Sequence, residues 1–285
     1  MHQLYKTIAP AVAALALAAP VAAQDAATVW DNSTEFAFVT TAGNASSTTL
    51  GLKSALTGTA AVSTFKLEIG GIRASSDFTD RSAVGTASSF TVNEVVRSER
   101  SAENYFARSR FDRNLGDNAF FIFGGAGWER NTFAGFNNRL SFVAGIGDTW
   151  VNDDRTLFKT DIGGTYTIQK DVDPAPGSSD GFGGLRATVE LKRDLSETTA
   201  FESLLVADEN LQNTDDLRFD WVSSIAVALT EGLAFKTSLQ LLFDNDPALI
   251  GVPLFDGGGT PVGTDVLVPS NDLDTFLTVS LVIKL

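Results

Sequence analysis

The segment Leu277-Thr278-Val279-Ser280-Leu281-Val282-Ile283-Lys284-Leu285 at the end of the sequence decides the fold. Its odd positions all carry large apolar side chains, whereas most even positions carry Thr, Ser or Lys. An alternation with a period of two places the two sets on opposite faces of a β-strand. The segment therefore predicts a strand with one apolar face and one largely polar face.

The same alternation recurs along the chain, and we count twelve segments of this kind. Several of them, such as 118–131 and 181–194, are 14 residues long, whereas strands of soluble proteins typically have about 5 to 6 residues. That length suits a tilted strand that crosses a membrane and protrudes from it. The segments lie near 34–42, 47–57, 60–73, 102–115, 118–131, 135–149, 155–170, 181–194, 198–209, 215–229, 232–245 and 273–285.

The connections between these segments differ in length according to whether they are odd- or even-numbered along the chain. Every even-numbered connection is short, whereas the longest ones, 74–101, 171–180 and 246–272, are all odd-numbered. Short turns at one end and long loops at the other are typical of an outer-membrane barrel with both termini in the periplasm. In the first long connection, Phe90–Arg97 (FTVNEVVR) alternates well enough to extend the hairpin of the fourth strand above the membrane.

Aromatic residues gather near the ends of the predicted strands, as interfacial girdles do. A soluble β-sandwich would instead bury them in its core, but strand length and loop parity together favour the barrel. The sequence thus predicts an all-β fold, a single antiparallel transmembrane β-barrel of about twelve strands, give or take two. The aromatic residues near the outer ends are Tyr105, Trp128, Phe136, Tyr166, Phe182, Phe219, Trp221, Phe243 and Phe276.

The first residues predict the compartment. A short start with Lys6 leads into an Ala- and Leu-rich run, which Pro20 ends before the small residues at 21–23. This is the pattern of a cleavable signal peptide, and the run is short and interrupted for a membrane anchor. We expect a signal peptide at 1–23, a periplasmic N-terminal tail at 24–33 and an outer-membrane β-barrel domain at 34–285. The location is then the outer membrane of a Gram-negative bacterium.

Composition excludes several function classes. The 285 residues include 21 Lys and Arg against 35 Asp and Glu, a formal charge of −14, so the chain lacks the basic surface that nucleic acid requires. It has no Cys, and its one His is His2, which the predicted cleavage removes. Thiol chemistry, His-dependent hydrolysis and the commonest metal ligands are therefore missing. We expect no enzyme, no cofactor and no metal site.

The stretch Glu103–Gly147 resembles the family of salt-induced outer-membrane proteins, a domain family of unknown function. The resemblance is carried by Trp128-Glu129-Arg130-Asn131-Thr132-Phe133-Ala134-Gly135, by Arg139 and by Gly145-Ile146-Gly147, and it extends over most of the chain from Leu50. Asn131 departs from the usual Asp, which puts a charge role at that position in doubt. The resemblance implies a Gram-negative outer-membrane barrel and no assigned activity.

The resemblance to outer-membrane barrels also implies partners: outer-membrane lipid, lipopolysaccharide and the barrel assembly machinery. Many such barrels end in Phe or Trp, and this chain ends in Leu285. We expect insertion to work with a weaker signal. The oligomeric state is left open.

The inward face of the predicted barrel supplies the candidate functional residues, because it mixes charges of both signs. These groups either line a constriction that sets ion selectivity or pair across the lumen and close it. The two alternatives correspond to a narrow, weakly selective, porin-like diffusion channel and to a structural or stress-related envelope barrel. The candidate pore-lining residues are Arg108, Arg110, Asp112, Arg139, Lys159, Asp161, Arg186, Glu190, Lys192, Arg218, Asp220 and Lys236.

Overall fold

The computed structural model describes residues 28–41, 46–86, 89–116, 119–132, 134–174, 180–269 and 271–284. The predicted signal peptide and Leu285 lie outside these ranges. Within them, no helix is long and apolar enough to span a membrane. Fourteen strands are formed: β1 (Val29–Thr41), β2 (Ser46–Thr59), β3 (Ser63–Thr86), β4 (Ser89–Asn114), β5 (Phe120–Asn131), β6 (Phe136–Asn152), β7 (Thr156–Asp171), β8 (Gly181–Asp194), β9 (Thr199–Asn210), β10 (Leu217–Thr230), β11 (Leu233–Asp244), β12 (Leu249–Phe255), β13 (Pro261–Pro269) and β14 (Leu273–Lys284).

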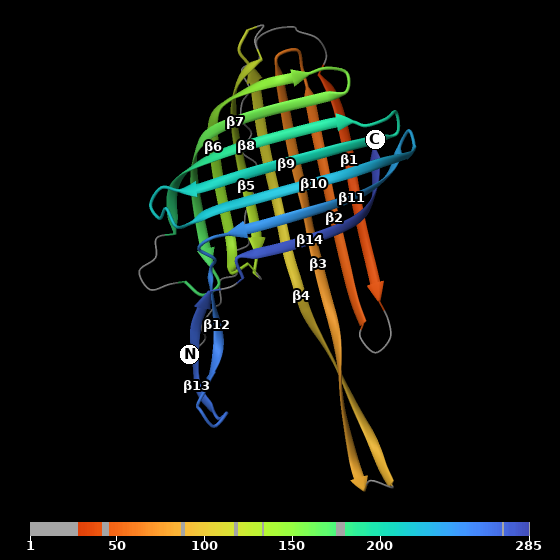
Figure 1. The fold of residues 1–285 in the computed structure, drawn as a ribbon, viewed down its shortest axis with the longest axis vertical. Helices are drawn as coiled ribbons and strands as arrows, with labels where there is room; N and C mark the ends of the chain where they lie inside the picture. The colour runs from red at the N-terminus through yellow and green to blue at the C-terminus, as the bar shows by residue number, and fades with distance from the viewer. Residues whose placement is uncertain are drawn as a thin grey trace, which may run out of the picture.

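Twelve of the described strands close into one antiparallel barrel, in the order β1-β14-β11-β10-β9-β8-β7-β6-β5-β4-β3-β2 (Figure 1). Each predicted segment corresponds to one of these strands, so the twelve-stranded fold is confirmed. The barrel begins earlier than expected, because β1 starts at Val29. The boundary predicted at residue 34 is therefore wrong, and 29–33 form part of the wall rather than of a tail.

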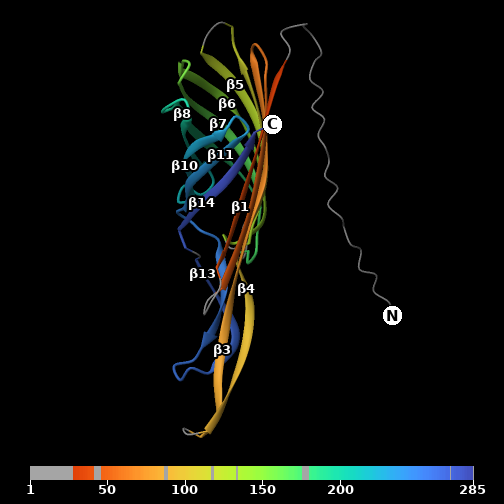
Figure 2. The ribbon, with the colours of Figure 1, turned by 90° about the vertical axis from the view of Figure 1, so that its right-hand side faces the viewer.

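The two ends of the barrel differ, as the loop parity predicts. Short turns join β2 to β3, β4 to β5, β6 to β7, β8 to β9 and β10 to β11 at one end, which we call the turn end. At the other end, the loop end, β3 and β4 continue as a paired ribbon until Thr86 meets Ser89. The segment Phe90–Arg97 lies in this ribbon, as predicted. Figures 1 and 2 show it projecting well beyond the barrel wall.

The connection 246–272 is more ordered than the sequence predicts. Instead of an irregular loop, it contains the hairpin β12–β13, which is a separate two-stranded sheet. This hairpin projects from the loop end on the same side as the β3–β4 ribbon (Figure 1). Its strands are short and contain Pro253, Pro261 and Pro269, which weakens the strand signal because proline cannot donate to a ladder.

The wall has an apolar outer face and a polar inner face. Leu277, which faces outward on β14, is 72% exposed, whereas Ser280 on the other face is 4% exposed. Among the described residues only six apolar side chains are buried, Phe121 and Phe123 among them. The distribution is the reverse of that in a soluble protein, in which apolar side chains fill the interior.

Candidate functional site

The strand registers place all twelve candidate residues on the face that points into the barrel. Arg218, for example, stands opposite Asp208 on one side and Asp244 on the other. The direction of this face is established by ion pairs that join strands with other strands between them, since such contacts cross the barrel interior. The part these residues play in conduction stays a prediction.

Four of the candidates form a network near the turn end. Arg110 on β4 donates from Nε to Asp112 Oδ1 at 2.7 Å and from Nη2 to Asp161 Oδ2 on β7 at 2.8 Å. Lys159 Nζ, also on β7, donates to Asp112 Oδ2 at 2.8 Å. This β4–β7 network therefore reaches over the inner faces of β5 and β6.

Two phenylalanines and a glycine make that reach feasible. The Arg110 guanidinium stacks on Phe123 at 4.0 Å and the Lys159 ammonium lies 4.4 Å from the centre of Phe121. Phe121 leans over β6 at Gly147, where an added Cβ would collide with Phe121 Cζ and lie 2.7 Å from Asp161 Cβ. The Gly145-Ile146-Gly147 motif thus leaves room for Phe121 and Phe123, which we call the aromatic floor, beneath the β4–β7 network.

A second contact spans the diameter of the barrel. Arg108 Nη1 on β4 lies 3.8 Å from Asp220 Oδ2 on β10, and the strand order places β4 and β10 six positions apart in either direction. Gln240 holds Asp220 by a 2.8 Å hydrogen bond to Oδ1. The Arg108 side chain is 43% exposed although it lies inside the barrel. We call this contact the diametric pair; it is loose and open to water in the lumen.

A third group lies beside the seam where the first and last strands meet. Only four residue pairs, from Ser33↔Lys284 to Phe36↔Leu281, join β1 to β14 in the described residues. Lys236 on β11 reaches past β14 to Glu35 on β1, with Nζ 2.8 Å from Oε1, and its distance to Glu202 is 3.9 Å. The ion pair therefore fastens the shortest ladder of the barrel.

The remaining candidates near mid-wall pair locally. Arg186 donates to both carboxylate oxygens of Asp208 at 2.8 and 2.9 Å, and Lys192 lies 3.1 Å from Glu190 on the same strand. Glu68, which is absent from the predicted set, lies 3.3 Å from both Lys53 and Lys66.

Several inward charges that the structure brings into these clusters are absent from the predicted set. The parity of each strand would have found them, since Lys66 and Glu68 alternate along β3 as Arg108 and Arg110 do along β4. The omitted inward charged residues include Glu35, Lys53, Lys66, Glu68, Glu129, Asp171, Glu202, Asp208, Asp244 and Asp274.

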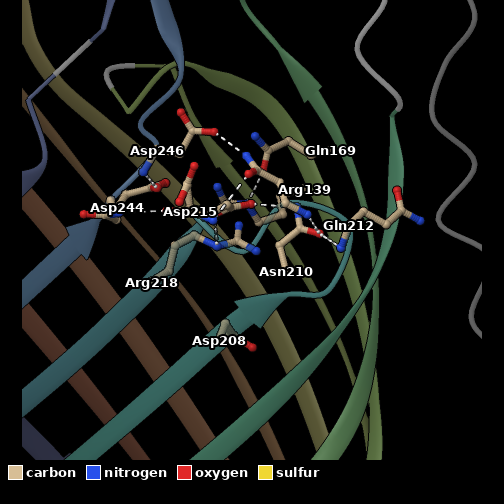
Figure 3. Close-up of polar contacts among 12 residues, drawn as sticks. Arg139, Gln169, Asp208, Asn210, Gln212, Asp215, Arg218, Asp244 and Asp246 are labelled. Atoms are coloured by element: carbon tan, nitrogen blue, oxygen red, sulfur yellow. Dashed lines mark hydrogen bonds and ion pairs between the residues drawn. The ribbon is translucent and has the colours of Figure 1, made fainter.

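Arg139 and Arg218 lie in the lumen near the loop end, among the polar residues drawn in Figure 3. Each has an aromatic ring beneath its guanidinium: Phe136 at 3.9 Å from Arg139 and Phe182 at 5.3 Å from Arg218. The sequence predicts both rings in the outer girdle, and this is wrong because both face inward. Phe276 is wrongly assigned for the same reason, since it pairs with the inward Gln240.

The turn before β6 explains the motif residue that departs from the family pattern. Asn131 is buried, and its Oδ1 accepts a hydrogen bond from the Ala134 amide at 3.0 Å. A side-chain oxygen is all that this turn requires, so Asn replaces Asp without a charge. Gly135 follows with φ of +81°, a conformation in which residues with a Cβ are strained.

Ten of the twelve candidates, all but Asp161 and Lys236, line a cavity of about 810 Å³. Its lining includes Thr57 and Asn152 beside the turn end as well as Pro247 and Asp272 beside the loop end. In the described part of the chain, no cluster of three or more His, Cys, Asp and Glu side chains could hold a metal ion. The lining of the cavity presents opposed charges, such as Arg108 and Asp220.

Comparison with known proteins identifies a family. A family model described as "Protein of unknown function, DUF481" matches residues 34–253, in agreement with the resemblance to a domain family of unknown function. The salt-induced part of that resemblance is not tested by the match. No curated protein matches the sequence significantly.

Three solved structures illustrate the likeness in fold. The NanC porin has a TM-score of 0.46 at 8% identity, with 90% of this chain and 98% of that chain covered. The translocator domain of the autotransporter NalP from Neisseria meningitidis has a TM-score of 0.42 at 12% identity, with 90% and 86% covered. The anion-selective porin from Comamonas acidovorans has a TM-score of 0.38 at 9% identity, with 91% and 99% covered.

Proposed function

The chain belongs to the DUF481 family of proteins of unknown function, and we propose that it is a narrow diffusion channel for ions and small solutes in the outer membrane of a Gram-negative bacterium. The observation that carries the proposal is the charged cavity of about 810 Å³, whose lining residues lie at both ends of the barrel. A passage of this kind conducts when charged groups can bind an ion briefly and release it.

The membrane location is supported by the outer face of the wall. Leu277, Val279, Leu281 and Ile283 on β14 are all exposed, and other strands present Phe36, Leu52, Ile146 and Trp221 in the same way. Soluble proteins rarely expose a continuous apolar surface of this extent, whereas a lipid-facing barrel requires one. Outer-membrane lipid and lipopolysaccharide are the partners that this surface fits, with insertion by the barrel assembly machinery.

The diametric pair is the constriction of the proposed channel. Arg108 and Asp220 approach from opposite walls to 3.8 Å, so an ion that passes must separate them or slip beside them. Their loose contact and the exposure of Arg108 keep the cost of separation low, because a pair in contact with water is worth only about 0–1 kcal/mol.

Planar-bilayer recording of the purified, refolded protein tests this function. We expect small single-channel steps from the wild type and larger steps from Arg108→Ala and Asp220→Ala, because each variant removes one side of the constriction. Lys170→Ala, which removes an exposed charge from the outward face of β7, serves as the control and should leave the steps unchanged. A wild type and two lumen variants that all fail to conduct would refute the channel.

The second candidate is a closed, non-enzymatic barrel with a structural or stress-related role in the envelope. The β4–β7 network and the diametric pair favour it, since ion pairs across the lumen are also how a barrel of this size would be sealed. This candidate predicts a silent bilayer for the wild type and both lumen variants. The same recordings therefore separate the two functions.

A further inference from the structure

Arg139 differs from the other inward cations in its partners. Its Nε donates to the neutral Gln169 Oε1 at 2.6 Å, and Phe136 lies beneath its guanidinium. Among the residues that the structure describes, no carboxylate lies within ion-pair distance of it. Arg139 lines the cavity, and within the described residues its remaining guanidinium donors have no protein acceptor.

Arg218 is also incompletely satisfied. Its Nε lies 3.2 Å from Asp216 Oδ1, yet the geometry makes no hydrogen bond and the buried Nε lacks an acceptor within the described ranges. Its side chain is 14% exposed. The contrast is Arg186, which lines the same cavity and donates twice to Asp208.

The two guanidinium groups share one part of the lumen. Arg139 and Arg218 both line the cavity. Figure 3 shows both side chains reaching into one polar cluster near the loop end of the lumen. Two like charges with unused donors in a partly desolvated wall are costly, and a shared anion would relieve both the repulsion and the missing hydrogen bonds.

We infer that Arg139 and Arg218 form a transit site for the oxyanion of a small solute, a carboxylate or a phosphate, at the loop end of the lumen. The planar fork of a guanidinium matches either oxyanion in a bidentate manner. The rings of Phe136 and Phe182 hold the guanidinium groups of Arg139 and Arg218, respectively, by stacking. The inference rests on the proposed channel function and names the class of solute that the channel favours.

The acidic neighbours make this a weak site, as transport requires. Glu129 stands opposite Arg139 and Asp244 opposite Arg218 in the strand registers, and Asp216 Oδ1 lies 3.2 Å from Arg218 Nε, so acidic groups offset the charge of the two arginines. An anion is then held by directed hydrogen bonds more than by net charge. Release stays fast, which is the condition for conduction through a binding site.

Equilibrium dialysis of the refolded chain against radiolabelled inorganic phosphate tests the site independently of conduction. We expect weak binding, reduced roughly tenfold in Arg139→Gln and in Arg218→Gln, since each removes charge-assisted hydrogen bonds. Lys170→Gln, which removes the same charge from the outward face of β7, should bind as the wild type does. Heat-modifiable gel migration shows that each variant has folded, and Arg139→Lys, which keeps the charge but not the fork, should bind at an intermediate level.

Competition distinguishes the classes of solute. Succinate should displace phosphate, and glucose should not; displacement by glucose or equal phosphate binding by the wild type and Arg139→Gln would overturn the site. Bilayer recordings keep the two proposals separate. Arginine-dependent phosphate binding by a silent barrel would refute the channel and retain the site, whereas a conducting barrel that binds no phosphate would refute the site alone.

Discussion

Replacing Gly147 by alanine tests whether the aromatic floor of the lumen is built as described. The added Cβ would collide with Phe121 Cζ and lie 2.7 Å from Asp161 Cβ, whereas carbon atoms pack best at about 3.5–4.0 Å. Phe121 is 1% exposed and Asp161 is held by Arg110. Neither neighbour can move without disturbing the β4–β7 network.

The expected cost follows from overpacking, which typically destabilises a packed interior by about 1–3 kcal/mol. A change from Gly to Ala within a strand also has an opposite effect of roughly 0.5–1 kcal/mol through the unfolded chain. Gly164→Ala supplies the matched control, because nothing lies within 4 Å of its added Cβ. The difference between the two variants isolates the steric cost, which corresponds to about a 5- to 140-fold change in the unfolding equilibrium.

Urea unfolding of the refolded protein in lipid vesicles, followed by tryptophan fluorescence, measures this difference. Phe121→Leu should reduce the cost of Gly147→Ala, because it removes the ring atom that the new Cβ meets. If Gly147→Ala and Gly164→Ala are equally stable, the proposed packing of Phe121 over β6 is refuted.

Other predictions concern the seam, the turns and the projecting hairpin. Lys236→Met should lower the unfolding free energy by roughly 1–3 kcal/mol, because it leaves the half-buried Glu35 carboxylate unpaired. Urea unfolding midpoints measure this loss of stability, and an unchanged midpoint would contradict the prediction. Asn131→Ala should cost about 1–3 kcal/mol in the same assay by removing a buried acceptor, whereas Asn131→Asp should retain the turn. Two backbone amides hold the pKa of Asp256 below its ordinary value of 3.8. The ionised carboxylate therefore stabilises the hairpin turn above pH 3.8, and this contribution is lost as the pH falls through the lowered pKa. The amide NMR shifts of the turn should titrate with a midpoint below 3.8, and a midpoint at or above 3.8 would reject the contact. Replacing 249–269 by a short Gly-Ser linker should leave heat-modifiable migration intact, since β12–β13 lies outside the barrel sheet; loss of that behaviour would show that the hairpin supports the barrel.

Alternation in the sequence accounts for the twelve strands because each strand has one face in a different environment from the other. A shift by one residue would turn Leu277 inward and Ser280 outward, so the pattern fixes face and register together. The hairpin β12–β13 could not be predicted in this way. In the described residues its strands pair only with each other and not with the barrel, and Pro253 interrupts the strand signal.

The sequence predicts which charged residues face the lumen, but not which of them pair with each other. Parity assigns Arg110 and Asp161 to the inner face, but nothing in the sequence shows that they meet past two intervening strands. That contact depends on Gly147 and on the position of Phe121, which are properties of packing. Phe136 shows a further limit: its place near a strand end predicts a girdle residue, whereas the bulge between Phe136 and Asn138 turns it inward, beneath Arg139.

Site-directed spin labelling along β14 tests most directly the claim that the wall separates lipid from an aqueous lumen. The chain contains no Cys, so Leu277→Cys, Thr278→Cys and Val279→Cys can each carry a single nitroxide in vesicles. The account predicts that labels at 277 and 279 are relaxed by lipid-soluble oxygen and the label at 278 by a water-soluble nickel complex. Equal accessibility of all three labels to the nickel complex would contradict it.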